Sequence, residues 1–391
     1  MKTATHEVAM KPLSPIFDHF TRSGVRVLME MAARVPDCIH LEVGEPDFPT
    51  PAHIVEAAHA AARQGFTKYT SNAGFPSLRE AIAAKVQREN GFACAPDQVV
   101  ITPGAVAALA IAVLTVAGRD DEVLLPDPGW PNYRAIAALA GARAARFRLH
   151  AARGFQPDLG EIEALVTPRT KAILVNSPGN PTGGVFSPEV SEGLVRLASR
   201  RDLYVVTDEV YEAFVFEGEH VPLGRIDTEG RVLSVFGFSK TYAMTGWRLG
   251  YLVATPALAA RAASLLEPFA SCASSVSQKA GEAALLGPQE CVRQFRDAYR
   301  ARRDLVRDAL AGTNLLAAVP RGAFYALLNV GGPDRTAMDF ATALLERERV
   351  AVTPCESFGP SGAGQVRISF ATADHLLKEG LRRIAAFARG A

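Results

Sequence analysis

The 391-residue chain lacks a charge excess, a long apolar run and an apolar leader. Its 42 Lys and Arg residues nearly balance 41 Asp and Glu residues, which leaves a net charge of +1. That balance offers no basic surface for nucleic acid or for an anionic membrane. The longest run of small apolar residues, 105–118, is too short for a membrane span and predicts a buried helix. Residues 1–10 are polar and lack the apolar segment of a signal peptide.

Cysteine is scarce and scattered. The five cysteines are odd in number and show no Cys-x-x-Cys spacing: Cys38, Cys94, Cys272, Cys291 and Cys355. This pattern excludes a disulfide framework and disfavours a zinc site, because both need closely spaced or paired cysteines. We therefore expect no metal and a cytoplasmic location.

The order of apolar runs predicts an α/β fold. Six strands, expected to begin near residues 99, 122, 142, 171, 204 and 232, alternate with helical segments, and a seventh follows at 249–254. The link 240–247 is too short for a packed crossover helix, so the seventh strand should run antiparallel. Strands at 322–330, 350–354 and 365–370 predict a second, smaller sheet. The charged segment 282–311 is interpreted as a solvated interdomain helix.

These elements define the expected architecture. We expect a three-layer large domain with a mostly parallel seven-stranded sheet over residues 46–285. A smaller α+β domain is expected over residues 286–391, and the N-terminal segment 1–45 should join it, so that both chain ends build this domain.

The chain is organised around Lys240. An apolar run, 232–238, predicts a buried strand that ends just before Ser239-Lys240. In open α/β sheets, ligands bind at the carboxyl ends of the strands. A lysine among apolar groups there is shifted toward its neutral amine, which can attack an aldehyde to form a Schiff base. Pyridoxal phosphate is the aldehyde that this chemistry favours.

Other residues need partners that such a cofactor and its substrate would supply. Asp208 ends an apolar strand, where a buried carboxylate requires a cation such as a protonated pyridine nitrogen. Arg367 lies in the apolar stretch 366–370 and requires an anion. The turn Pro103-Gly104 precedes a helix whose free N–H groups favour a phosphate. The loop 177–184 holds two prolines and three glycines, which predicts a rigid loop with at least one cis peptide bond.

Ser239-Lys240 followed by Met244-Thr245-Gly246-Trp247-Arg248-Leu249-Gly250-Tyr251 resembles the cofactor-lysine signature of the class I/II aminotransferases. These are aspartate aminotransferase-like, fold-type I pyridoxal-phosphate enzymes, and further matches run from about residue 41 to 370. The resemblance implies that Lys240 holds pyridoxal phosphate as an aldimine. It also implies transfer of an amino group from an L-amino acid to a 2-oxo acid through a pyridoxamine intermediate.

The resemblance further implies roles for individual residues. Lys240, Asp208 and Tyr211 are the implied catalytic residues. Arg248 and the backbone of Ala105 and Val106 would bind the phosphate, Trp130 would stack on the pyridine ring, and Asn180 with Tyr211 would bond the ring oxygen. The full implied cofactor set is Tyr69, Ala105, Val106, Trp130, Asn180, Asp208, Tyr211, Ser239, Lys240 and Arg248.

The implied substrate-binding residues are Gly44, Trp130, Asn180 and Arg367, with Arg367 on the α-carboxylate, where its planar fork matches the geometry. In similar enzymes the residue matching Tyr69 reaches the cofactor phosphate of the neighbouring subunit, which implies a homodimer.

Three positions depart from the family pattern. Val106 and Gly237 stand where relatives often carry a phosphate-binding side chain, so the phosphate site should depend more on Arg248, on Tyr69 and on helix N–H groups. Cys355-Glu356 replaces a stretch that commonly contains glycine, and it leaves the rim of the pocket undefined.

Other functions remain open at this stage. A pyridoxal-phosphate lyase catalysing β-elimination, of the C–S lyase type, would use the same carbanion. A ligand-sensing regulator would need a helix-turn-helix domain, and only about forty residues precede Gly44. A catalytically dead relative is disfavoured, because every implied chemical position is present. For the substrate, Arg22 and Arg26 are candidate anchors for a side-chain carboxylate. The apolar residues Leu13, Ile16 and Phe17 favour a neutral or aromatic amino acid instead.

Overall fold

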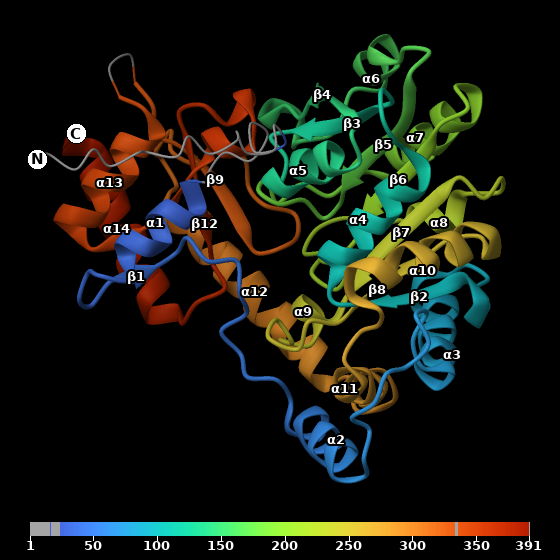
Figure 1. Ribbon diagram of the computed structural model, residues 1–391. Coiled ribbons are helices and arrows are strands. Elements are labelled where there is room, and N and C mark those ends of the chain that lie inside the picture. The colour runs from blue at the N-terminus through green and yellow to red at the C-terminus, as the bar shows by residue number, and fades with distance from the viewer. Residues whose placement is uncertain (1–15, 17–23, 333–334, 391) are drawn as a thin grey trace, which may run out of the picture.

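The computed structural model describes residues 16, 24–332 and 335–390, and the structural statements below concern these residues. Figure 1 shows a large group of elements around one long sheet and a second, smaller group that contains α13 and α14. The helix α12 (Glu290–Ala309) runs between the two groups.

The large sheet has seven strands in the order β2-β8-β7-β6-β5-β3-β4. Only the pairs β2–β8 and β8–β7 are antiparallel, and the other pairs are parallel. The predicted antiparallel seventh strand, β8, is thus confirmed. The strands are β2 (Val99–Thr102), β3 (Glu122–Asp127), β4 (Arg143–Arg148), β5 (Thr170–Asn176), β6 (Tyr204–Asp208), β7 (Val232–Gly237) and β8 (Gly250–Val253).

Helices cover both faces of this sheet. Along β5, Ala172 and Leu174 face one helix layer, whereas Ile173 and Val175 face the other, as the period-2 alternation of a strand requires. The first layer holds α4 (Ala105–Val116), α5 (Pro131–Leu139) and α10 (Pro256–Ala270). The second layer holds α6 (Leu159–Leu165), α7 (Pro188–Arg200) and α8 (Leu223–Ile226). The expected three-layer architecture is therefore present.

Further helices pack at the β2 end of the sheet. These are α2 (Ala52–Arg63), α3 (Pro76–Lys85) and α11 (Ser275–Leu286), with the π-helical turn Val86–Asn90 after α3. A 3-10 turn, Pro96–Gln98, leads into β2, and another, Ala151–Arg153, follows β4.

The smaller group of elements combines residues from distant parts of the chain. Its antiparallel sheet has the order β11 (Thr353–Pro354), β12 (Gln365–Ser369), β9 (Tyr325–Asn329). Beside it, β1 (Ile39–His40) pairs with β10 (Val350–Ala351). The helices α1 (Gly24–Ala32), α13 (Ala337–Glu348) and α14 (Asp374–Gly390) share one core with these strands. The 3-10 turns Cys355–Phe358 and Pro360–Gly362 connect β11 to β12.

The predicted solvated helix at 282–311 was wrong in two respects. The segment is broken at Gly287-Pro288, between α11 and α12, since proline cannot continue a helix. Two of its arginines are buried and paired, because apolar neighbours on α12 turn that face inward. Arg302 bonds Asp47 and Asp374, and Arg303 bonds Glu217.

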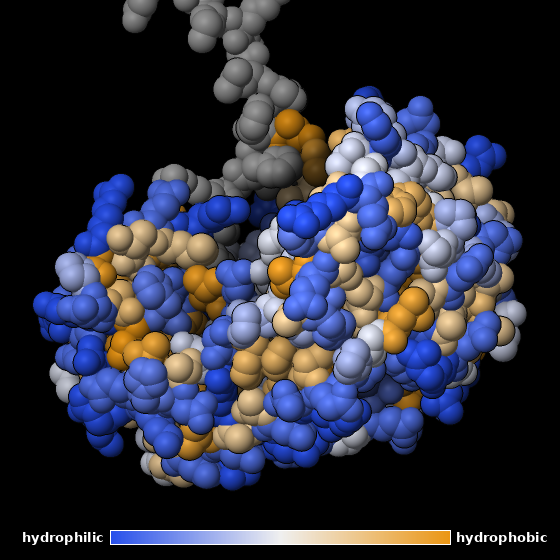
Figure 2. Space-filling model, turned by 90° about the horizontal axis from the view of Figure 1, so that it is seen from below, coloured by the Kyte–Doolittle hydropathy of each residue, from blue (hydrophilic) through white to orange (hydrophobic). Residues whose placement is uncertain are grey.

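Strongly hydrophobic residues on the face drawn in Figure 2 form separate small patches among hydrophilic ones. Among the described residues, no helix has the length and apolar character needed to cross a membrane. All five cysteines lie within the described residues, and each is a free thiol.

Candidate active site

A cavity of about 420 Å³ lies where the carboxyl ends of the large sheet's parallel strands meet the smaller sheet. It collects nearly all the residues that the sequence singled out, as expected for the strand ends of an open α/β sheet. The predicted residues that line it are Gly44, Ala105, Val106, Trp130, Asn180, Asp208, Tyr211, Ser239, Lys240, Arg248 and Arg367.

Lys240 lies on the one-turn helix α9 (Phe238–Thr241), directly after β7. Its Nζ donates a hydrogen bond of 2.7 Å to the carbonyl oxygen of Gly44. Burial, partly opposed by the negative charge of Glu45, lowers the pKa of Lys240 to about 8. A substantial share of this amine is therefore neutral near pH 8, as a nucleophile requires.

Asp208 is the last residue of β6 and is buried. The hydroxyl of Tyr133 donates to its Oδ2 at 2.7 Å, and the backbone N–H of Val210 lies 3.3 Å from its Oδ1. Burial raises the pKa of Asp208 to about 6, although the hydrogen bond from Tyr133 opposes the rise. The carboxylate thus has donors on both oxygens but no ion pair among the described residues, although the charge of Lys240 acts on it, and a cationic ligand group would complete its environment.

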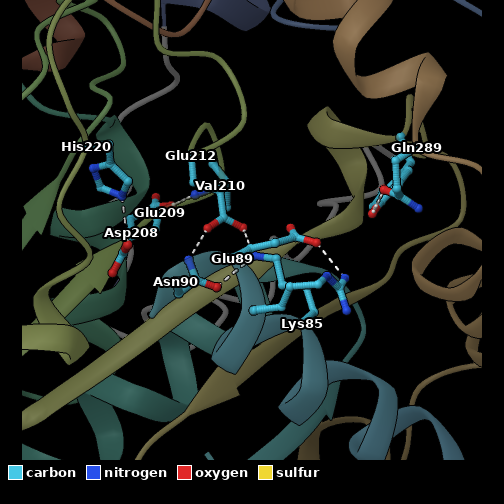
Figure 3. Close-up of polar contacts among 11 residues, drawn as sticks. Lys85, Glu89, Asn90, Asp208, Glu209, Val210, Glu212, His220 and Gln289 are labelled. Atoms are coloured by element: carbon cyan, nitrogen blue, oxygen red, sulfur yellow. Dashed lines mark hydrogen bonds and ion pairs between the residues drawn. The ribbon is translucent and has the colours of Figure 1, made fainter. Parts of the chain in front are cut away.

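A second buried carboxylate lies directly behind Asp208. Glu209 Oε2 contacts Nε2 of His220 at 2.9 Å, and burial raises the pKa of Glu209. Figure 3 shows this pair beside a neighbouring group in which Glu212 accepts hydrogen bonds from Lys85 and Asn90. These carboxylates behind the strand end have hydrogen-bond partners within the protein, whereas Asp208 also lines the cavity.

The N-terminus of α4 and Arg248 form one cationic corner of the cavity. Gly104, the N-cap of α4, has a φ of 84°, and a Cβ there would lie 2.4 Å from Nη2 of Arg248. Glycine at this position therefore lets the guanidinium approach the helix end. Arg248 also donates to the carbonyl of Thr245 at 2.9 Å. Helix N–H groups with an adjacent arginine suit a phosphate.

Arg367 reaches the opposite side of the cavity from β12 and is 4% exposed. It donates to Oδ1 of Asn180 at 3.0 Å and to the carbonyl of Glu42 at 2.6 Å. Its Nε has no hydrogen-bond partner among the described residues. A buried guanidinium with an unused donor favours an anionic ligand group.

Asn180 and Tyr211 are held by their neighbours. The backbone N–H of Asn180 donates to Oδ1 of Asn176 at 2.7 Å, and the hydroxyl of Tyr211 lies 2.9 Å from that of Tyr325. The expected cis peptide in loop 177–184 is confirmed, since both the Ser177–Pro178 and the Asn180–Pro181 bonds are cis.

Tyr69 lies apart from the other predicted residues. It is 90% exposed, in the segment between α2 and α3. Three predictions on the N-terminal segment, Leu13, Phe17 and Arg22, fall outside the described residues.

Residues 36–384 match the family described as "Aminotransferase class I and II". The chain belongs to this family. The aspartate/prephenate aminotransferase of Thermus thermophilus is 40% identical over 361 residues, which cover 91% of this chain and 92% of that protein. The aspartate aminotransferase of Pyrococcus horikoshii is 36% identical over 367 residues, with 93% and 94% covered.

A solved structure agrees with these relatives. Aspartate aminotransferase from Thermus thermophilus with maleate has a TM-score of 0.91 and 38% identity, and the match covers 97% of this chain and 100% of that one. The protein is accordingly an aminotransferase with the aspartate aminotransferase fold. The β-eliminating lyase alternative is not favoured.

The sequence reasoning missed two tyrosines of this aminotransferase. Tyr133 follows Trp130 by one helical turn on α5, and that spacing could have pointed to it. Tyr325 had no comparable signal, because its contacts come from residues distant in the sequence. From α1, Arg26 and Met29 also line the cavity, and of these only Arg26 had been considered.

Proposed function

We propose that this aminotransferase uses pyridoxal phosphate, bound through Lys240, to move an amino group from an L-amino acid to a 2-oxo acid. One observation carries the proposal. The amine of Lys240, the carboxylate of Asp208 and the cationic corner at Arg248 face a single cavity. Those three groups match the aldehyde, the pyridine nitrogen and the phosphate of this cofactor.

In this proposal, different residues bind different parts of the cofactor. Arg248 and the N–H groups of Ala105 and Val106 would bind the phosphate, because they combine a guanidinium with the positive end of a helix. Asp208 would keep the pyridine nitrogen protonated. Asn180 and Tyr211 would bond the ring oxygen, Trp130 would cover the ring face, and Ser239 would complete the cofactor-binding set.

Arg367 and Asn180 would orient the substrate, with the backbone of Gly44 beside them. The guanidinium suits a carboxylate, and its buried Nε has no hydrogen-bond partner among the described residues. Pyridoxal phosphate, when bound, supplies the aldehyde and an electron-accepting ring. The Lys240 amine, released when the substrate amine takes its place, would then move the proton of the substrate Cα, because it is already beside the reacting atoms.

We also propose that the enzyme is a homodimer in which Tyr69 reaches the partner's site. Support comes from exposed hydrophobic side chains on neighbouring elements, since α2 packs on α11. Val55 on α2 is 44% exposed, Phe269 on α10 is 64% exposed and Leu286 on α11 is 75% exposed. A subunit interface would cover such exposed apolar side chains.

The proposed domain boundaries are 1–45, 46–285 and 286–391. They are supported by α12, which begins against the core of the large group through Val292 and continues into the smaller core through Tyr299 and Val306. A cytoplasmic location is supported by the five free thiols.

The test is a single-substrate spectral titration. Purified enzyme is loaded with pyridoxal phosphate, single L-amino acids are added without a 2-oxo acid, and the cofactor absorbance is followed. We expect stoichiometric conversion to the amine form of the cofactor with the correct donor, and reversal by a 2-oxo acid. Lys240→Ala should give no conversion. Catalytic release of ammonia or a thiol, with an unchanged cofactor spectrum, would contradict the proposal.

A further inference from the structure

We propose that Tyr325 is a positioning residue that serves both halves of the active site, its hydroxyl orienting Tyr211 and its ring supporting Arg367. The inference rests on the function proposed above. Tyr325 is the first residue of β9 and is 1% exposed, yet it lines the cavity.

The hydroxyl of Tyr325 has one close partner among the described residues. It lies 2.9 Å from the hydroxyl of Tyr211, and the two rings meet edge to face at 86°. A hydroxyl carries a single hydrogen, so only one of the two can donate in this contact. If Tyr325 donates, the hydrogen of Tyr211 remains available for a ligand in the cavity.

Both hydroxyls are buried, and the positive charge of Arg367 acts on both. Burial raises the pKa of Tyr325, but the positive charge of Arg367 opposes that rise. Burial also raises the pKa of Tyr211, and the neighbouring Tyr325 raises it further. The contact allows either hydroxyl to donate, and an acceptor oxygen in the cavity would select the orientation in which Tyr325 donates and Tyr211 points its hydrogen into the cavity.

The ring of Tyr325 supports the guanidinium that would bind the substrate carboxylate. The Cζ atom of Arg367 lies 4.4 Å from the centroid of this ring and 5.3 Å from that of Phe358. A desolvated cation over an aromatic face is held electrostatically and in a defined plane. The hydrogen bonds of Arg367 to Asn180 and to the Glu42 carbonyl hold its two terminal nitrogens, and the ring of Tyr325 fixes the plane in which the guanidinium lies.

Gly44 closes the arrangement. A Cβ on Gly44 would lie 2.0 Å from the hydroxyl oxygen of Tyr325, so only glycine admits this tyrosine. The carbonyl of the same Gly44 accepts the hydrogen bond from Lys240. The side chain of Tyr325 thus contacts three parts of the site: the backbone of Gly44, the hydroxyl of Tyr211 and the guanidinium of Arg367.

Two variants separate the roles of hydroxyl and ring. Tyr325→Phe keeps the ring and removes the hydroxyl. In the pyridoxal-phosphate-loaded enzyme we expect the pH midpoint of the cofactor absorbance to rise by about 0.5 to 1 unit, and kcat to fall about threefold to tenfold. The affinity for an unreactive carboxylate should stay within about twofold, because the cation–π contact persists.

Tyr325→Leu removes both features. Here we expect the same change in the absorbance midpoint and, in addition, about tenfold weaker carboxylate binding. Binding is measured calorimetrically with maleate and with 3-phenylpropionate, and the tighter ligand of the wild-type enzyme is used throughout. If Tyr325→Leu does not fold, Tyr325→Met, which also lacks a π face, takes its place.

The matched control for hydroxyl loss is Tyr299→Phe. Tyr299 is fully buried in the same core, and its hydroxyl has no hydrogen-bond partner among the described residues. Tyr299→Phe should leave the pH midpoint of the cofactor absorbance, kcat and the carboxylate affinity unchanged. The groups that face the two tyrosine hydroxyls stay intact in all variants: Tyr133 on α5, Asp208 on β6, Lys240 on α9 and Arg367 on β12.

A wild-type midpoint and kcat in Tyr325→Phe would overturn the role of the hydroxyl. Equal carboxylate affinity in Tyr325→Phe and Tyr325→Leu would overturn the role of the ring. Failure of the proposed function is distinguishable from both, because wild-type enzyme would then show no cofactor conversion with any amino acid.

Discussion

Lys240 and Asp208 carry opposite charges in water. Burial lowers the pKa of Lys240 and raises the pKa of Asp208, and both shifts favour the neutral form of the side chain. The lowered pKa of Lys240 yields a substantial share of free amine near pH 8, whereas the raised pKa of Asp208 reflects the burial of its carboxylate. At the residue scale, both side chains are therefore suited to bind a ligand.

For Lys240, we expect the reactivity of the cofactor-free enzyme toward a dilute amine-selective reagent to be half-maximal near pH 8. The neutral amine is the reactive form, so labelling of the Lys240 peptide should rise through this pH. Peptide mass spectrometry provides the measurement. The urea-unfolded chain is the reference, and its midpoint should lie in the ordinary range of lysine. A folded-state midpoint above pH 10 would refute the shift.

For Asp208, the pKa is raised from 3.8 to about 6, so its contribution to stability is fully present below pH 3.8 and is lost as the pH rises through 6. Asn does not ionise, so its substitution for Asp208 removes this pH-dependent loss of stability in the cofactor-free protein. The Tyr133 hydroxyl can still donate a hydrogen bond to the amide oxygen. We expect the stability gain of Asp208→Asn over wild type to grow by about 2 kcal/mol between pH 4.5 and 7.5.

Urea unfolding of the two cofactor-free proteins at both pH values measures this difference. A gain that does not change with pH would contradict the assigned pKa. The same variant should bind pyridoxal phosphate more weakly, because the ring nitrogen loses its counter-charge.

At the scale of single elements, the sequence predicted part of the junction between β2 and α4, and the tertiary structure supplied the rest. The sequence predicted the strand, the Gly turn and the helix, and α4 begins directly after that turn, at Ala105. The proximity of Arg248 was supplied by β8, which lies beside β2 and brings the preceding loop to the helix end.

Gly104→Ala should therefore weaken pyridoxal phosphate binding by about tenfold or more, because the new Cβ would displace Arg248. The matched control is Gly65→Ala, which has a similar φ of 86° but nothing within 4 Å of the added Cβ. Both variants share the cost of a positive φ, about 1 kcal/mol. Absorbance titration gives cofactor affinity and thermal unfolding gives stability. Equal cofactor affinity in the two variants would refute the contact.

At the scale of the whole molecule, the active site draws on both groups of elements. Asp208 and Lys240 come from the large sheet, whereas Arg367 and Tyr325 come from the smaller one. Relative movement of the two groups would change the distance between the cofactor-binding and carboxylate-binding residues. The proposed dimer adds a third source, the partner's Tyr69.

A subunit mixture tests that third source. Tyr69→Phe and Lys240→Ala homodimers should each have low activity, since one lacks the phosphate contact and the other lacks the amine. A mixed dimer would contain one site with Lys240 from one subunit and Tyr69 from the other. We expect co-expression with two affinity tags to recover about half of the wild-type activity per mixed dimer.

If Tyr69 serves its own subunit, the mixed dimer would show no recovery beyond the Tyr69→Phe contribution. Light scattering of the purified pool checks that dimers are present. A monomeric wild-type enzyme would contradict the dimer proposal directly.

The sequence by itself determined the elements and most of the chemistry. Short apolar runs that alternate with helical segments predicted the seven strands, and the lysine and aspartate at the ends of two of them were recognisable because ligands gather at strand ends. These signals are local, so short stretches of residues suffice to read them.

Only the tertiary structure decided which distant side chains meet. Tyr325 joins Tyr211 and Arg367 because β9 pairs with β12 and both approach the end of β6 across the cavity. Arg302 and Arg303 are buried rather than solvated because α12 turns one face into the smaller core. Such contacts depend on how whole elements pack, and a local pattern of residues carries no information about a partner more than a hundred positions away.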